Sequence, residues 1–268
     1  MPGLSRETES FLGWLGGERG RSANTVAAYR RDLAAYERWL GEAGTTVGDA
    51  DGAAVARYVA ALTAAGRQPA SVTRALVAIR ALHRHSGSDA AGAIDGPAVA
   101  AAPPAALSRA AVGRLLSSVR GDGPIERRDR AILEVLCRTG VRTSELVGLD
   151  LADLDPAAGA AHVVAVNGKP RIVPVPPPAV AKLEEWLAPA GRPSLAGRRR
   201  ELALFVNARG GRLSRQAAWA LVRRRGEEAG LGATGVGPQL LRHTYAVHLL
   251  DDGVAPATVR RLLGQVDR

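Results

Sequence analysis

Residues 139–149 read TGVRTSELVGL and mark the junction of two helices. The segment before it, 127–139, has the apolar spacing of a helix, and Gly140 is expected to end that helix. Arg142 follows at the opening of a second, shorter helix. A helix N-terminus favours an anion, because its unpaired backbone N–H groups and the helix dipole point towards it. The stretch therefore predicts a mostly helical fold with a candidate anion site at Arg142.

Three further segments carry candidate site residues: VNGKPRIVPV (166–175), QLLRHTYAVHLL (239–250) and LLGQ (262–265). Arg242 lies in the first turns of a helix, and two guanidinium groups can grip both free oxygens of one phosphate in a bidentate geometry that lysine cannot form. Lys169 follows the hairpin-turn signal Asn167–Gly168, from which its ammonium could reach a departing oxygen. A single arginine at a helix start is more often part of a surface ion pair. The hypothesis of a phosphate site therefore depends on the occurrence of Arg142, Lys169 and Arg242 together in one domain.

The first hundred residues predict a bundle of four helices. A short helix lies around residues 11–15, and apolar residues at intervals of three and four predict helices over 24–40, 51–65 and 71–85. Asn24 is the expected N-cap of the second helix. An Ala-, Gly- and Pro-rich stretch without apolar periodicity follows and is typical of a linker. We therefore expect a helical domain over 1–87, a linker over 88–107 and a second domain over 108–268.

The second domain mixes helices with a little sheet. Ser108 is expected to cap its first helix, and residues 188–200 are expected to form a loop. The run Arg223–Arg225, followed by two glutamates, is either a DNA-facing turn or a solvated helix face, and we favour DNA. Strands are predicted over 162–166 and 171–175, and further helices over 176–187, 214–229, 238–251 and from 256 onward. The fold class is mainly α with a small β-sheet.

The charge is unevenly divided along the chain. The net charge is +10, and residues 108–268 hold 25 basic against 16 acidic residues, whereas residues 1–107 are nearly balanced. Such an excess is expected of a domain that grips a polyanion, although solubilising surface charge is the alternative. Only two of the 36 basic residues are lysines, Lys169 and Lys182, so a lysine at a specific spot is informative.

Several functional classes find no support in the sequence. Cys137 is the single cysteine and lies in an apolar run, which excludes a disulfide framework and indicates a core residue. His243 and His248 are five residues apart, not the four of a helical zinc pair, and no glycine-rich phosphate loop follows a strand. No stretch of this sequence is long enough to span a membrane, and we expect no secretory segment because residues 1–10 contain no apolar run. We expect no metal, no cofactor, no membrane association and a cytoplasmic location.

At these motifs the chain resembles the tyrosine recombinases, the lambda integrase (phage integrase) family, and most closely its Xer-like members. The segment NTVAAYRRDL (24–33) resembles part of the family's N-terminal SAM-like core-binding domain, and TGVRTSELVGL resembles its first arginine motif. GKPRIVPV (168–175) resembles the family's lysine hairpin. LSRQAAW (213–219) together with QLLRHTYAVHLL resembles its second arginine block. The resemblance covers essentially the whole chain. It implies a four-helix core-binding domain followed by an α+β catalytic domain.

The resemblance also implies chemistry. Family members cleave and rejoin DNA through a tyrosine that forms a 3′-phosphotyrosyl link. By motif, Arg142 and Arg242 would stabilise the pentavalent phosphate, and Lys169 would protonate the departing 5′ oxygen. Gln239 and Gln265 stand where the family usually has histidine. An amide can donate a hydrogen bond to phosphate, but it cannot exchange a proton at neutral pH.

The nucleophilic tyrosine is expected about nine residues beyond Gln265, which would fall past Arg268. We therefore expect a chain truncated at its C-terminal end that lacks this tyrosine and cannot cleave as written. Tyr29, Tyr36 and Tyr58 belong to apolar stripes, and Tyr245 is a poor candidate nucleophile.

Partners follow from the same resemblance. We expect the chain to bind double-stranded DNA, with further protomers of the same or a related recombinase on that DNA. The candidate DNA contacts are Asn24, Thr25, Arg30, Arg31, Arg80, Arg215, Gln216 and His243. Two functions remain open: a site-specific recombinase or integrase, and a DNA-binding protein on the same scaffold that no longer cuts and competes with or regulates an active relative. A helical interaction module unrelated to DNA has only composition in its favour.

Overall fold

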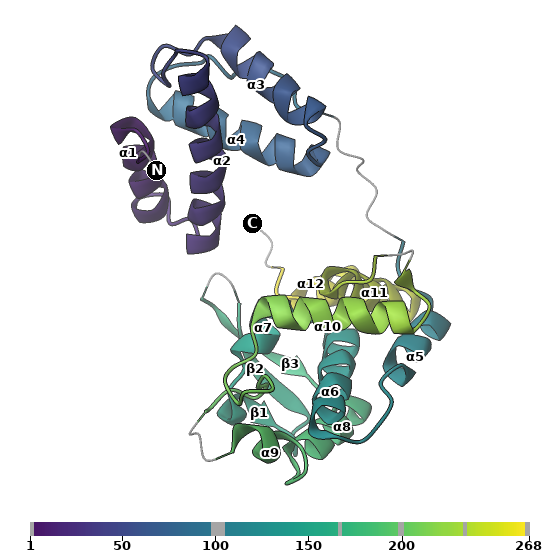
Figure 1. The fold of residues 1–268 in the computed structure, drawn as a ribbon. Helices are drawn as coiled ribbons and strands as arrows, with labels where there is room; N and C mark the ends of the chain where they lie inside the picture. The colour runs from purple at the N-terminus through teal and green to yellow at the C-terminus, as the bar shows by residue number, and fades with distance from the viewer. Residues whose placement is uncertain (1–2, 98–104, 166–167, 198–200, 233–234, 266–268) are drawn as a thin grey trace. The chain divides into compact units, whose positions relative to one another are not determined.

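The computed structural model describes residues 3–97, 105–165, 168–197, 201–232 and 235–265 (Figure 1). The chain divides into two units, Met1–Ala102 and Pro103–Arg268. The first unit is helical and the second combines helices with a small sheet, so the expected fold class is confirmed. Within the described residues, no helix is both long and apolar enough to cross a membrane.

The first unit is a bundle of four helices, α1 (Arg6–Gly17), α2 (Ala23–Glu42), α3 (Gly52–Ala64) and α4 (Pro69–His85). Their apolar stripes meet in one core around the fully buried Phe11, Leu33 and Ile79. The Tyr36 hydroxyl lies 3.1 Å from Nε2 of His83 inside this core, so both polar groups are paired.

One predicted helix start in this unit is wrong. The N-cap of α2 is Ser22, whose side chain accepts the backbone N–H of Thr25. Asn24 lies in the first turn instead, because a serine two residues earlier already satisfies an N–H that would otherwise lack a partner.

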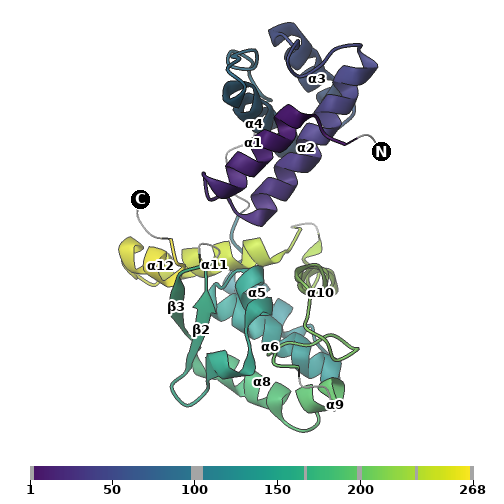
Figure 2. The same cartoon turned by 90° about the vertical axis from the view of Figure 1, so that its left-hand side faces the viewer.

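The second unit is built around α6, which contacts both α8 and α11. Both views show α10, α11 and α12 at one end of this unit and α8 with α9 at the opposite end (Figures 1 and 2). The helices are α5 (Arg109–Ser117), α6 (Pro124–Thr139), α7 (Thr143–Gly148), α8 (Pro177–Leu187), α9 (Arg192–Ala196), α10 (Arg215–Glu228), α11 (Pro238–Asp251) and α12 (Pro256–Leu262).

The sheet is antiparallel with strand order β1 (Leu154–Asp155), β2 (Ala160–Val164) and β3 (Pro170–Pro174). In the register of β2 and β3, Val163 pairs with Arg171. The two-residue β1 was not predicted, because so short a strand carries no periodicity of its own. Gly168 has the left-handed backbone that the predicted hairpin turn requires, whereas Asn167 lies outside the described residues.

Two helices also differ from the sequence prediction. Helix α6 begins at Pro124, earlier than expected, because proline is favoured in the first turn of a helix. The expected loop over 188–200 contains α9, which the buried Arg192 anchors by donating to the carbonyl groups of Glu201 and Ala203. Such a tertiary anchor leaves no local signal in the sequence. The run Arg198–Arg200 lies outside the described residues.

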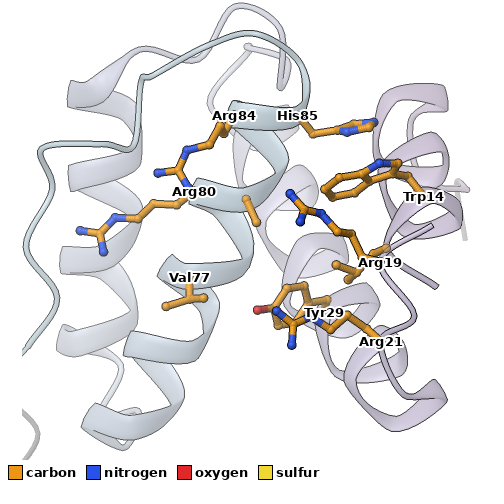
Figure 3. A pocket seen from close by; sticks show the side chains of 10 residues that line it. Trp14, Arg19, Arg21, Tyr29, Val77, Arg80, Arg84 and His85 are labelled. Atoms are coloured by element: carbon orange, nitrogen blue, oxygen red, sulfur yellow. The ribbon is translucent and has the colours of Figure 1, made fainter. Parts of the chain in front are cut away.

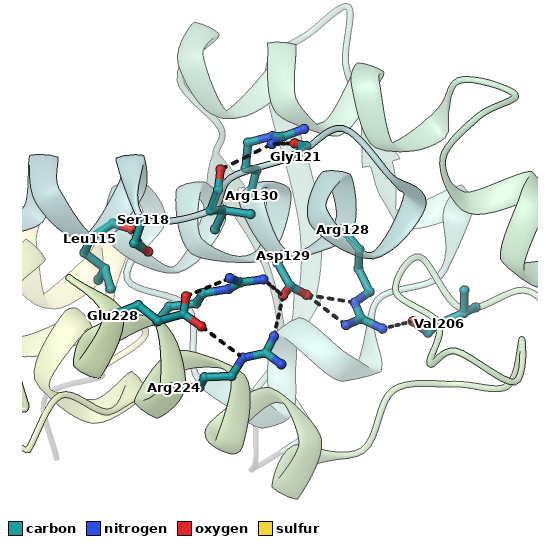
Figure 4. A network of polar contacts seen from close by, with 11 residues as sticks. Leu115, Ser118, Gly121, Arg128, Asp129, Arg130, Val206, Arg224 and Glu228 are labelled. Carbon is teal, nitrogen blue, oxygen red and sulfur yellow. Dashed lines mark hydrogen bonds and ion pairs between the residues drawn. The ribbon is translucent and has the colours of Figure 1, made fainter.

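A buried carboxylate ties α6 to α10 (Figure 4). Asp129 has no exposed surface, and its oxygens accept from Arg128 at 2.8 Å, Arg225 at 2.7 Å and Arg224 at 3.0 Å. Within the arginine run 223–225, Arg225 is buried and pairs with Asp129, so for this residue the preference for a DNA-facing role is corrected. The side chains of Arg223 and Arg224 stay about half exposed, and for them the preference remains a prediction.

We expect Asp129→Ala to lower the free energy of unfolding of the second unit by about 3–5 kcal/mol, because it leaves buried guanidinium groups without their counter-charge. Asp122→Ala is the matched control: Asp122 also pairs with two arginines, Arg127 and Arg130, but its side chain is 72% exposed, so its loss should cost less than about 1 kcal/mol. Native-state hydrogen exchange of the α6 amides measures both. Equal effects of the two substitutions would contradict the prediction.

Candidate phosphate-binding site

The centre of the candidate site is the buried carboxylate of Glu145 in α7, which is 4% exposed. Arg171 of β3 donates to both of its oxygens, Nη1 to Oε1 at 2.5 Å and Nη2 to Oε2 at 3.0 Å. Arg142 donates its backbone N–H to Oε2 at 2.7 Å and its Nη1 to Oε1 at 3.2 Å. One carboxylate therefore orients two arginines that lie far apart in the sequence.

These contacts also fix the charge of Glu145. Burial acts to raise its pKa, but the hydrogen bonds from Arg171 and from the backbone of Arg142 outweigh burial, and the pKa lies below its ordinary value. Glu145 is therefore ionised at neutral pH and provides the negative charge that holds the arginines.

Arg142 lies where the sequence places it, at the N-cap of α7. Gly140 ends α6 in a left-handed conformation with φ of 62°, and a Cβ there would lie only 2.4 Å from a ring carbon of Tyr245. Glycine is thus required both for the backbone and for the close ring. The sharp turn leaves the Arg142 side chain 32% exposed, so its guanidinium can meet a ligand.

Arg242 of α11 is 6% exposed and joins two other segments. Its Nη1 donates to the carbonyl of Gly140 and its Nη2 to the carbonyl of Leu263, both at 2.6 Å. A guanidinium has five N–H groups, so these two bonds leave capacity for a further acceptor.

Burial lowers the pKa of Arg242 to about 10, and the charges of Arg142 and Arg171 add to this effect while Glu145 opposes it. The group remains a cation at neutral pH. Three arginines around one carboxylate leave an excess of positive charge, and a bound anion would relieve their mutual repulsion.

The end of α12 is held by the same arginines. Arg171 donates from Nε to the carbonyl of Leu262 at 3.3 Å, next to the Leu263 carbonyl held by Arg242. Carbonyl groups at a helix C-terminus lack partners within the helix and favour a cation. Gly264 follows with φ of 62°, and a Cβ there would lie 3.1 Å from the Arg171 guanidinium. The exposed Gln265 is thereby placed next to the arginine group.

The remaining predicted residues of this site lie at its edges. Lys169 is exposed and directly precedes β3, two residues before Arg171. Gln239 is exposed, one turn before Arg242, and lines a hollow with His243 at the start of α11. Arg215 and Gln216 are exposed in the first turn of α10.

The predicted DNA contacts of the first unit belong to a separate group. Arg30 forms an ion pair with Glu9, and Arg80 donates to the carbonyls of Ala91 and Ile94, while Asn24 and Arg31 are exposed and Thr25 is half-buried. Arg80 also lines a hollow between α1, α2 and α4, shown in Figure 3. The basic and aromatic side chains around this hollow are Trp14, Arg19, Arg21, Tyr29, Arg80, Arg84 and His85.

Glu145 and Arg171 were missed by the sequence reasoning, although each left a signal. Glu145 stands three residues after the N-cap, where a glutamate commonly accepts the N–H of the capping residue. Arg171 stands two residues after Lys169 and opens the predicted return strand of the hairpin. Among the described residues, no group of three His, Cys, Asp or Glu side chains could hold a metal ion.

Comparison with known proteins decides the family. Residues 106–267 match the model of the phage integrase family, and residues 8–86 match that of the phage integrase N-terminal SAM-like domain. The chain belongs to the phage integrase family. Its relatives include the tyrosine recombinase XerD of Mycobacterium tuberculosis (strain ATCC 25618 / H37Rv), which is 42% identical over 98% of this chain and 90% of the relative. XerD of Bifidobacterium longum is 37% identical over 98% of this chain and 89% of the relative. The predicted Xer-like resemblance is confirmed.

Solved structures of this family share the fold. The XerH site-specific recombinase bound to palindromic difH substrate, in a post-cleavage complex, superposes with a TM-score of 0.76 at 19% identity, over 97% of this chain and 78% of that one. A lambda integrase tetramer bound to a Holliday junction gives 0.75 at 17% identity, over 98% and 74%. At these identities the comparison establishes a recombinase fold.

We expect Glu145→Gln to destabilise the second unit by roughly 3 kcal/mol at neutral pH, because the arginines lose their buried counter-charge. The folded-state pKa of Glu145 is lowered, so its stabilising effect is present above the ordinary value of 4.5 and is lost as the pH falls through the folded value. The difference in melting temperature between the wild type and Glu145→Gln should therefore shrink as the pH falls below 4.5. Calorimetry over this pH range measures it. A difference that stays constant in acid would show that the carboxylate charge is not responsible.

Proposed function

We propose that this chain is a tyrosine recombinase-type protein for site-specific recombination, which holds one phosphate of duplex DNA between Arg142 and Arg242 (the arginine clamp). One observation carries this proposal. Arg142, one-third exposed, and the buried, fixed Arg242 lie around the same ionised Glu145 together with Arg171. They leave a net positive site with guanidinium N–H groups for which the described residues supply no acceptor. A phosphodiester supplies the negative charge and the paired acceptor oxygens that such a site lacks.

The fixed geometry matters for catalysis as well as binding. Glu145 fixes Arg142, and two backbone carbonyls fix Arg242, so neither guanidinium has to reorganise when charge builds up on the phosphate. Donors oriented in advance towards developing charge commonly supply the largest share of catalysis. The arrangement is therefore suited to a pentavalent phosphate intermediate or transition state.

Lys169 is proposed as the general acid. It directly precedes β3 and stands two residues before Arg171 in the sequence. Its ammonium would protonate the 5′ oxygen as the P–O bond breaks. Gln239 and Gln265, at the positions where the resemblance implies histidine, would donate hydrogen bonds to phosphate oxygens without transferring protons.

The first unit is proposed to grip the same duplex. The hollow of Figure 3 gathers four arginines and a histidine around Trp14 and Tyr29. Cations interleaved with aromatic rings suit the sugar–phosphate backbone, and the candidate contacts Asn24, Thr25, Arg30 and Arg31 lie on the neighbouring α2. The DNA-bound state of similar recombinase structures supports this assignment, as it supports further recombinase protomers as partners.

A second candidate function is DNA binding without cleavage. One observation in its favour is the placement of Tyr245: its ring packs on Gly140, it lines a hollow with Cys137 and Arg138, and burial raises the pKa of its hydroxyl. A half-buried phenol with a raised pKa is a poor nucleophile. A protein of this kind would compete with an active relative for its sites or regulate it.

The DNA-binding proposal predicts affinity that falls steeply with salt, because phosphate contacts release counterions. Arg142→Ala should weaken binding about tenfold and reduce the salt slope by about one. Fluorescence anisotropy with a labelled duplex at several salt concentrations measures both. Arg209→Ala removes an exposed arginine from the turn after Val206 and should leave the affinity unchanged. Binding that is absent or independent of salt would overturn the proposal.

The assignment of Tyr245 predicts the outcome of a trapping experiment. A nicked half-site substrate releases its short 5′ product and so retains any phosphotyrosyl link. The 268 residues should give no covalent adduct with it, since Tyr29, Tyr36 and Tyr58 lie in the first unit and Tyr245 is packed on Gly140. Denaturing electrophoresis detects the adduct. If one forms, and Tyr245→Phe abolishes it, the assignment of Tyr245 is wrong.

A further inference from the structure

Helix α10 exposes a large aromatic side chain beside the arginine clamp. Trp219 is 49% exposed, although its neighbours Ala218, Leu221 and Val222 are buried in the core of the second unit. Leaving an indole ring in water forgoes about 2 kcal/mol of burial, so an exposed tryptophan next to a functional site indicates a contact surface.

The surroundings of Trp219 point to the clamp. Together with Thr143, Gln239 and His243 it lines a hollow at the start of α11. Thr143 is the residue after Arg142, and Gln239 and His243 flank Arg242 in α11. A Cβ on Gly237 would lie 3.5 Å from the indole nitrogen, an ordinary contact distance, so the ring lies close to the start of α11.

The ring is also held by charge. The Arg223 guanidinium lies over it, 5.6 Å from the ring centroid. Arg215, Trp219 and Arg223 follow one another at intervals of four residues, which places them on one face of α10, and all three are exposed. The ring therefore stands between two cations on the face that borders the hollow.

We propose that the indole of Trp219 packs on the deoxyribose next to the phosphate held by Arg142 and Arg242; this inference rests on the proposed function. In a duplex each backbone phosphate is flanked by sugars, while the bases are stacked inside. A flat apolar surface beside a bound phosphate therefore meets the C–H face of a sugar. This contact sets how far the backbone enters the clamp, and it is independent of sequence.

The test compares Trp219→Ala with Trp219→Phe in binding to a labelled duplex. Trp219→Ala should bind about tenfold more weakly with an unchanged salt slope, because the lost contact carries no charge, and Trp219→Phe should retain most of the affinity. Leu202→Ala is the matched control: Leu202 is 64% exposed but lines neither the clamp nor the hollow, and its loss should leave binding unchanged.

A spectroscopic readout separates sugar from phosphate. The contribution of Trp219 is the part of the fluorescence change that is seen in the wild type and is missing in Trp219→Phe. This contribution should appear on addition of duplex DNA. It should not appear on addition of inorganic polyphosphate, which offers phosphate without sugar. Replacing every thymine by uracil removes the base methyl groups and should change nothing.

Three results would overturn the inference: equal affinity of Trp219→Ala and the wild type, an equal response to polyphosphate, or dependence on the thymine methyl. A wild type that binds no duplex would instead overturn the proposed function, so the two failures are distinguishable.

Discussion

The ion pairs around Glu145 organise the second unit. A buried carboxylate is costly to desolvate, and it is tolerated here because Arg171 pairs with both oxygens and the backbone of Arg142 supplies a further N–H. The Glu145 side chain thereby joins α7 to β3, and Arg171 extends this connection to the end of α12. Segments that could each move alone are thereby fixed relative to one another, which a phosphate site requires.

Arginine serves two purposes in this unit, and burial separates them. Arg128 and Arg225 are buried around Asp129, and Arg225 holds α10 against α6, whereas Arg142 keeps a third of its side chain exposed. Arg242 serves both purposes. It is buried and donates to two backbone carbonyls, and its guanidinium has further N–H groups that can donate to a ligand. A count of basic residues therefore overstates the surface available to DNA, because part of the charge excess stabilises the core.

The proposed DNA-binding surface of this unit joins different kinds of contact. The arginine clamp would take one phosphate, Lys169 would approach the leaving oxygen, and Trp219 would support the adjoining sugar. The binding energy of the two charged contacts depends on salt concentration, whereas that of the apolar contact does not. The charged and the apolar contributions to DNA binding can therefore be measured separately. The half-buried Tyr245 has no place in this scheme beyond packing on Gly140.

The sequence by itself determined the helices with strong apolar periodicity, the hairpin and the motifs around Arg142 and Arg242. These are local patterns: apolar residues recur every three or four positions in a helix and every two in a strand, and a residue such as Gly140 marks where a helix ends. Family membership followed from the order of those motifs. The tertiary structure alone decided which arginines pair with buried acids, that α9 forms, and that Trp219 lines a hollow with Thr143 and Gln239. Glu145 meets Arg171 across 26 positions and Asp129 meets Arg225 across 96, and no local pattern encodes such pairings, since they exist only once the core has brought the helices together.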